Sequence, residues 1–176
     1  MTPDSGCTPF PRVSWGEDRV TFLPGVIEES PVWALVFPFY GDKLVLAQIP
    51  GRGWCIPSGR IEPGETVEDG ARREVWEESG ATLSRMAPLG TFQLTNKTTG
   101  VVHYGVVYLG DVANLEDLPE GTESEGRLLI PMEDAENTYF AWDALLAAVF
   151  DYAEEKRYTL LPAGTSLAEF TQLETS

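Results

Sequence analysis

The sequence predicts an α+β fold, a sandwich built around a mixed β-sheet. Short apolar segments rich in Val, Leu and aromatic residues recur along the chain, as expected of strands. Two longer segments, residues 66–79 and 141–156, carry helical signals. A chain of 176 residues, 43% of them hydrophobic, can bury one core without disulfide or metal staples. The order of these segments favours helices packed on a sheet.

The first third of the chain is expected to form strands. Residues 1–11 are rich in proline and small polar residues and are predicted to be a loose leader. Turn residues then separate two predicted hairpins. The first joins Val13–Trp15 to Arg19–Phe22, and the second joins Val32–Phe37 to Leu44–Ile49 through Tyr40-Gly41-Asp42.

A segment punctuated by glycine and proline, residues 49–64, leads into the first helix. Thr66 is the expected N-cap, because its hydroxyl can accept from the amide three residues later. Gly80 is the expected stop, because glycine adopts the left-handed conformation that ends helices. The sequence therefore predicts a helix over residues 66–79.

The second half repeats the alternation of strand, loop and helix. Strands are expected over 89–94 and 101–109, and an amphipathic helix over 141–156. Between them, residues 111–136 hold nine acidic residues and one base, Arg127, so we expect a loop interrupted by the strand 128–130. A short helix is expected near 167–173. The predicted organisation is an N-terminal extension (1–30), one domain (31–160) and a C-terminal tail (161–176).

Charge and composition exclude several classes of protein. Twelve Lys and Arg against 28 Asp and Glu give a net charge of −16, which repels polyanions, so general nucleic-acid binding is not expected. No apolar run approaches the ~18 residues of a membrane span, and the N-terminus does not resemble a secretory signal. We therefore expect a cytoplasmic protein with no membrane partner.

The chemistry is expected on the predicted helix 66–79. Glu74, Glu77 and Glu78 are spaced i, i+3 and i+4, so their carboxylates point to one side of a helix. Such a cluster is unfavourable without a cation, and carboxylate oxygens are ligands for Mg²⁺ or Mn²⁺. Arg52 and Arg60 in the preceding loop are candidate phosphate-binding residues.

This segment resembles the Nudix box, G-x5-E-x7-R-E-U-x-E-E-x-G-U, in which U is a bulky aliphatic residue. The resemblance covers Gly59–Ala81, and the flanking pattern extends it over about residues 30–156. The chain departs from the box at Ala81, where a larger aliphatic residue is usual, and at Ser58, which replaces a frequent glycine. The matching positions are Gly59, Glu65, Arg73, Glu74, Val75, Glu77, Glu78 and Gly80.

The resemblance implies a Nudix-type α/β/α sandwich and a Mg²⁺-dependent hydrolase of a nucleoside diphosphate linked to a group X, with Mn²⁺ as a substitute metal. Glu74, Glu77 and Glu78 are then metal ligands or bases, and the Ser58 carbonyl is a further ligand. Glu65 and Arg73 are implied as a supporting pair. Family members often add a glutamate from a later loop, for which Glu120, Glu123 and Glu125 are candidates and Glu123 and Glu125 are favoured. The implied partner is a small nucleotide, and dimers are common in the family.

Three alternatives stay open. In the first, the glutamates of helix 66–79 form a solvated helix face without chemistry. In the second, the domain binds nucleotides without hydrolysing them. In the third, it is an isoprenoid diphosphate isomerase that uses Cys55. Several aromatic residues are candidates to stack a nucleobase, and the sequence does not choose among them. They are Phe37, Phe39, Tyr40, Trp54, Phe92, Tyr104, Tyr108, Tyr139 and Phe140.

Overall fold

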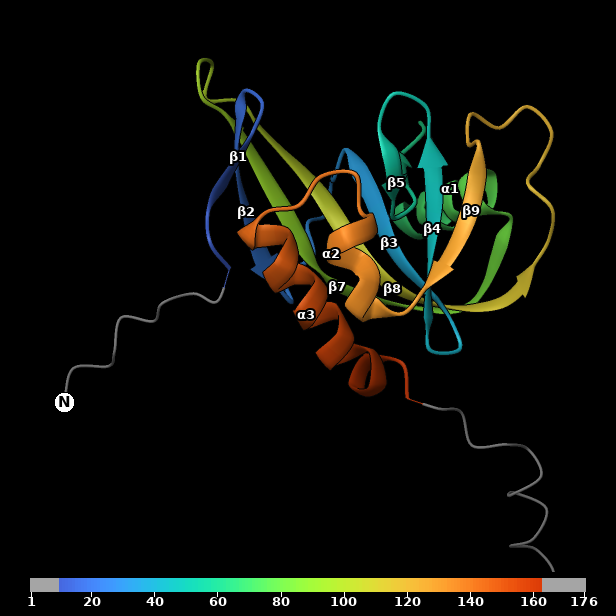
Figure 1. The fold of residues 1–176 in the computed structure, drawn as a ribbon. Coiled ribbons are helices and arrows are strands. Elements are labelled where there is room, and N and C mark those ends of the chain that lie inside the picture. The colour runs from blue at the N-terminus through green and yellow to red at the C-terminus, as the bar shows by residue number, and fades with distance from the viewer. Residues whose placement is uncertain (1–9, 163–176) are drawn as a thin grey trace, which may run out of the picture.

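The computed structural model describes residues 10–162 (Figure 1). Its strands are β1 (Val13–Trp15), β2 (Asp18–Pro24), β3 (Trp33–Tyr40), β4 (Lys43–Ile49), β5 (Gly53–Cys55), β6 (Ser58–Arg60), β7 (Ala81–Asn96), β8 (Val102–Leu115) and β9 (Gly126–Ile130). Its helices are α1 (Val67–Ser79), the 3₁₀ turn η1 (Met132–Asp134), α2 (Ala135–Thr138) and α3 (Ala144–Leu160).

The strands of the described region form one mixed sheet in the order β1-β2-β7-β8-β3-β4-β5. β3 and β8 are parallel, and the other pairs are antiparallel. The two short strands off this path are β6, which pairs with β3, and β9, which pairs with β4. The predicted mixed sheet is confirmed.

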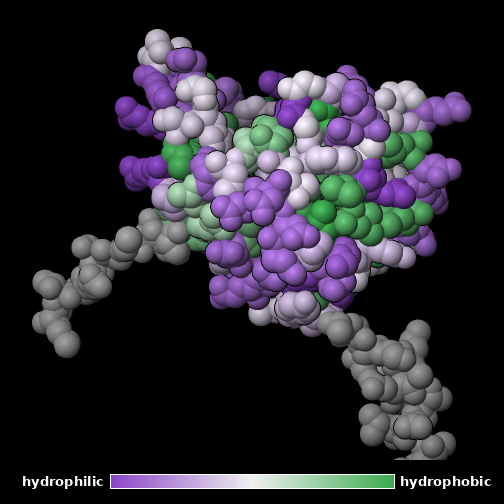
Figure 2. All heavy atoms as spheres, in the orientation of Figure 1, coloured by the Kyte–Doolittle hydropathy of each residue, from purple (hydrophilic) through white to green (hydrophobic). Residues whose placement is uncertain are grey.

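Helices cover both faces of the sheet, which completes the predicted sandwich. On one face α1 covers a core that includes Val36, Val75 and Val106, and on the other α3 covers one that includes Phe37, Leu109 and Val149. Hydrophilic side chains cover the outer surface of α3, whereas hydrophobic ones gather beside it over β4 and β9 (Figure 2). In residues 10–162, no helix is long and apolar enough to cross a membrane.

The first predicted hairpin forms, and it joins the main sheet. β1 pairs with β2, and β2 pairs along its whole length with β7, from Asp18↔Asn96 to Pro24↔Gly90. Phe10 is buried and packs edge-to-face on Phe22 and Tyr152. The prediction of a loose leader is therefore wrong at Phe10, because a large aromatic side chain there finds an apolar site on β2 and α3.

The predicted strands 89–94 and 101–109 are too short. β7 begins directly after helix α1 at Ala81, because Ala81 and Leu83 are buried while Thr82 and Ser84 are exposed, the alternation of a strand. β8 continues to Leu115, so the acidic loop begins at residue 116 rather than 111. The last helix runs over Ala144–Leu160 instead of 141–156, because Asp143 caps it. The helix predicted at 167–173 lies outside the described residues.

The sheet divides where the Nudix box begins. β3 and β4 pair only near their turn, at Phe39↔Leu44 and Tyr40↔Lys43. Further along, β3 pairs with β6 instead, and β4 pairs with β5 and β9. The chain from β5 to β6 fills the division, so Ser58 and Gly59 lie beside helix α1.

Candidate active site

Local signals fix both ends of α1. The Thr66 hydroxyl accepts from the Asp69 amide at 3.1 Å, as predicted, and Glu68 and Asp69 place negative charge at the positive end of the helix. Gly80 has φ of 70° and donates its amide to the Trp76 carbonyl. A Cβ at Gly80 would lie 2.5 Å from the Glu116 carbonyl oxygen, so the position requires glycine for space as well as for conformation.

Gly59 brings the main chain of β6 against the carboxyl group of Glu74. A Cβ built at Gly59 would overlap that carboxyl group, so a larger residue would displace it. Among the described residues every positive φ belongs to a glycine, so Ser58 has an ordinary backbone conformation. The replacement of glycine by Ser58 therefore introduces no backbone strain. Ala81 is fully packed in the core beneath α1 despite its small size.

Arg73 binds several glutamates at once. Its Nε and Nη2 donate to the two carboxylate oxygens of Glu65 at 3.1 and 2.7 Å, a bidentate pair. Its Nη1 donates to Glu74 at 2.6 Å and to Glu77 at 3.2 Å, and Nη2 also donates to the Arg60 carbonyl. The Arg73 guanidinium and the Glu62 amide together lower the pKa of Glu65 to about 2.

Glu78 is the most perturbed carboxyl group of the helix. It accepts a hydrogen bond from the Ser58 amide at 3.2 Å, which holds it against β6. Burial raises its pKa to about 8, and the nearby Glu74 carboxylate adds to the shift. Burial also raises the pKa of Glu74, against the opposing effect of Arg73. Burial therefore disfavours the charged forms of both carboxyl groups in the metal-free protein.

Arg73 and the three glutamates of α1 line a cavity of about 600 Å³, which we call the acid cavity. Six glutamates and one arginine face it, with part of the loop between β8 and β9. Its lining residues are Ile49, Glu62, Arg73, Glu74, Trp76, Glu77, Glu78, Pro119, Glu120, Gly121, Thr122 and Glu123. Of the candidates in this loop, Glu120 and Glu123 line the cavity, whereas Glu125 is not among its lining residues.

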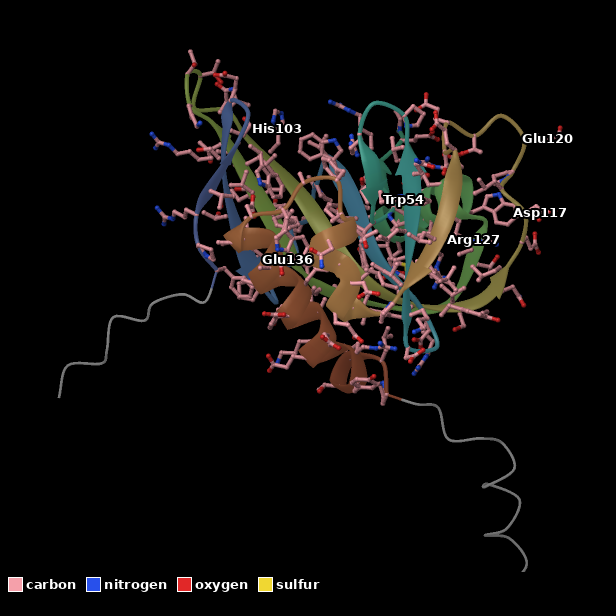
Figure 3. The ribbon with its side chains drawn as sticks, in the orientation of Figure 1. Trp54, His103, Asp117, Glu120, Arg127 and Glu136 are labelled. Carbon is pink, nitrogen blue, oxygen red and sulfur yellow. The ribbon has the colours of Figure 1, made fainter. Side chains whose placement is uncertain are left out.

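The loop is anchored to the end of α1. Arg127, on β9, donates to the carbonyls of Ser79 and Glu116 at 2.8 and 2.5 Å (Figure 3). The Thr122 hydroxyl donates to the Glu77 carbonyl at 2.5 Å. The Glu125 amide donates to the Gln48 carbonyl, so Glu125 belongs to the start of the β9 pairing. These contacts hold Glu120 and Glu123 over the acid cavity.

A second cavity, of about 450 Å³, lies between the β5–β6 segment and α3, and we call it the aromatic cavity. It is lined by Trp15, Leu35, Phe37, Arg52, Cys55, Ile56, Ser58, Phe92, Tyr139, Phe140, Ala141, Leu146, Val149 and Phe150. Four of the nine aromatic candidates from the sequence line it, namely Phe37, Phe92, Tyr139 and Phe140. Trp15 was missed, because nothing in its local sequence sets it apart from other strand residues.

The two predicted arginines differ in position. Arg52 lines the aromatic cavity and lies over the Phe140 ring at 5.7 Å. It is also close enough to Glu78 to influence its pKa. Arg60 is exposed, lies over the Trp33 ring and lines neither cavity. Of the two arginines, Arg52 is therefore the one that lies in the aromatic cavity close to Glu78 of the acid cavity.

Cys55 is buried in β5, with 2% of its surface exposed. Burial, with a contribution from Glu78, raises the pKa of its thiol to about 11. The thiol is therefore protonated at neutral pH and is a poor nucleophile. This environment gives no support to the isomerase alternative. His103 is exposed on β8, against Trp33 (Figure 3).

The donor chemistry of the acid cavity fits a divalent cation. Its polar groups are mostly carboxylate oxygens, which Mg²⁺ and Mn²⁺ prefer. In residues 10–162, no three acidic, histidine or cysteine side chains are already gathered as a metal-binding group. Glu74 and Glu77 are instead paired with Arg73, so binding a cation requires their carboxylates to turn toward Glu78.

Comparison with known proteins identifies the family. The model of the NUDIX domain matches residues 30–157. The chain is 31% identical over 111 residues to YtkD of Bacillus subtilis, a protein provisionally named an 8-oxo-dGTP diphosphatase, covering 63% of this chain and 69% of YtkD.

Solved structures agree. The fold matches the Bacillus subtilis pyrophosphohydrolase BsRppH with a TM-score of 0.71 at 25% identity, covering 84% of this chain and 98% of that one. A NUDIX hydrolase from Nitrosomonas europaea shares the fold, with a TM-score of 0.57 at 23% identity over 73% of this chain and 93% of that one. The resemblance carried by residues 59–81 is confirmed, and the chain belongs to the Nudix hydrolase family.

Proposed function

We propose that this protein hydrolyses the diphosphate linkage of a nucleotide in the acid cavity, with Mg²⁺ as cofactor and Mn²⁺ as a substitute. One observation carries the proposal: the acid cavity and the aromatic cavity meet at the contact between Ser58 and Glu78. A nucleotide has the matching two parts, a polyanionic phosphate chain and a flat aromatic base. The pyrophosphohydrolase activities named for YtkD and BsRppH support the same reaction class.

Glu74, Glu77, Glu78 and the Ser58 carbonyl would hold the cation. When bound, it neutralises phosphate oxygens and lowers the pKa of water. The raised pKa of Glu78 indicates a carboxyl group whose charge is costly in the metal-free protein, as expected of a position suited to a cation.

The remaining steps fall to the side chains of this chain. Arg52, between the cavities, pairs with phosphate oxygens and orients the substrate. A water oxygen attacks one phosphorus of the diphosphate, the bond from that phosphorus to the bridging oxygen breaks, and the bridging oxygen leaves with the second phosphate. A glutamate of the acid cavity accepts the proton of the water, and Glu120 and Glu123 are candidates beside the helix glutamates.

A hydrolysis panel tests the proposal. Purified protein would be assayed with ADP-ribose, nucleotide sugars, diadenosine polyphosphates and nucleoside di- and triphosphates, each with Mg²⁺, with Mn²⁺ and with a chelator. Metal-dependent turnover that falls more than tenfold in kcat in both Glu77→Gln and Glu78→Gln is the expected result.

Glu155→Gln is the matched control, because Glu155 is an exposed glutamate on α3 far from the acid cavity. A loss of less than tenfold in both helix variants would contradict the proposed roles. Tight nucleotide binding without turnover in either metal would instead favour the non-hydrolytic alternative.

A further inference from the structure

We propose that Trp15, on the N-terminal hairpin, is a specificity-determining residue that stacks on the base of the nucleotide in the aromatic cavity. The inference rests on the proposed function, because it assumes a nucleotide whose phosphates occupy the acid cavity. The family model begins at residue 30, so this wall of the cavity comes from a part of the chain outside the matched segment.

The sheet brings Trp15 to the cavity. β1 is attached through β2 to β7, and the Trp15 ring lies against Phe92 of β7 with ring centroids 5.3 Å apart. Trp15 also lines an adjoining cleft of about 200 Å³ with Trp33 and Arg52. The indole thus borders both the aromatic cavity and this cleft.

A hydrogen bond fixes the orientation of the indole. Its Nε1 donates to one carboxylate oxygen of Asp143 at 2.7 Å. The other oxygen of Asp143 caps α3 by accepting from the Leu146 amide at 2.8 Å, so the carboxylate is itself held in place. The one polar atom of the Trp15 side chain is therefore used, and the ring has only its aromatic surface to offer a ligand.

The surroundings favour a base as the occupant. Tyr139 and Phe140 also line the cavity, and the Tyr139 hydroxyl accepts from the Ile56 amide at 3.4 Å. The charged side chain of the lining is Arg52, and Ser58 contacts Glu78 of the acid cavity. An apolar, aromatic interior with a cationic residue toward the acid cavity suits a flat aromatic group joined to a phosphate chain.

Stacking on aromatic side chains contributes to binding without selecting one base. The reported range for a stacked base corresponds to about five- to hundredfold in affinity. We therefore expect Trp15 to lower the KM of purine and pyrimidine nucleotides alike. A substrate without a base should be insensitive to Trp15.

The test compares GTP and CTP with ribose 5-triphosphate, which keeps the sugar and phosphates and lacks the base. Trp15→Leu should raise KM for GTP and CTP about ten- to hundredfold with kcat within threefold. It should leave kcat/KM for ribose 5-triphosphate within twofold. Trp15→Phe retains an aromatic ring and should keep KM within about threefold of wild type. Equal effects on all three substrates, or no effect on GTP and CTP, would overturn the inference.

Two controls separate this inference from folding and from the proposed function. Val20→Ala removes buried side-chain atoms from the same hairpin without touching either cavity, so it should lower Tm and leave the ratio of GTP to ribose 5-triphosphate activity unchanged. A GTP analogue with methylene bridges in its phosphate chain gives the binding constant by titration calorimetry. If wild type has no turnover but Trp15→Leu binds the analogue at least tenfold more weakly, the hydrolase proposal fails and this inference stands. If wild type turns over normally and Trp15→Leu binds the analogue as tightly as wild type, the hydrolase proposal stands and this inference fails.

Discussion

Replacing Arg73 by Met should destabilise the metal-free protein by about 2–4 kcal/mol. Arg73 donates to Glu74, whose side chain is only 13% exposed. Hydrogen bonds to charged groups contribute about 1.5–3 kcal/mol each, and breaking a buried ion pair costs about 3–5 kcal/mol. Water reaches the Arg73–Glu74 pair in part, because the Arg73 side chain is 21% exposed, which reduces the cost to the stated range. Met retains an apolar stem of similar length, so the change isolates the guanidinium.

Urea denaturation in the presence of a chelator measures this difference. The corresponding shift in thermal midpoint is roughly 4–16 °C for a domain of this size. Arg85→Met is the matched control, because the Arg85–Asp111 pair is 40% and 32% exposed and such pairs contribute about 0–1 kcal/mol. If Arg73→Met lowers the free energy of unfolding no more than Arg85→Met does, then Arg73 does not stabilise the protein through its glutamate partners.

Further changes test other parts of the site. Gly59→Ala should abolish most metal-dependent activity while lowering Tm less than Arg73→Met does, because its Cβ displaces only the flexible end of Glu74 from Arg73; a larger loss of Tm than in Arg73→Met would contradict this. Burial raises the pKa of Glu78 from 4.5 to about 8. Between pH 4.5 and about 8, Glu78 is therefore protonated in the folded metal-free protein and ionised in the unfolded chain. The stability of the protein should fall as pH rises through that window, and thermal melts of Glu78→Gln should show a flatter slope. Asp143→Ala should cost about 1–2 kcal/mol in urea denaturation, because α3 loses its cap and Trp15 its acceptor; an unchanged midpoint would refute that role.

Features with local causes could be predicted from the sequence. Helix α1 begins and ends as expected, because Thr66 and Gly80 satisfy its terminal groups within a few residues of the chain. The two predicted N-terminal hairpins also form, because glycine-containing turns join short neighbouring strands. The pairing of Glu65 with Arg73 was also anticipated, from the resemblance to the Nudix box; Glu65 lies just before α1 and Arg73 within it.

Features assembled from distant segments of the chain could not be predicted from the sequence. β5 and β6 have three residues each, too few to show an alternation, and they form because β3 and β4 separate around them. The choice among the loop glutamates depends on contacts from Arg127 and Thr122 to α1, which no spacing encodes. The aromatic cavity joins residues from position 15 to position 150, so its membership follows from the fold alone.

The pairing of β2 with β7 has a consequence for the order in which the molecule is built. The first hairpin leaves the ribosome before its partner strand β7, which ends at Asn96, and such distant pairings form slowly. The acceptor for Trp15 is made later still, at Asp143. A growing chain can therefore assemble α1 and its glutamates before the aromatic cavity has its last wall. Until β7 is made, β2 stays open to unwanted pairing.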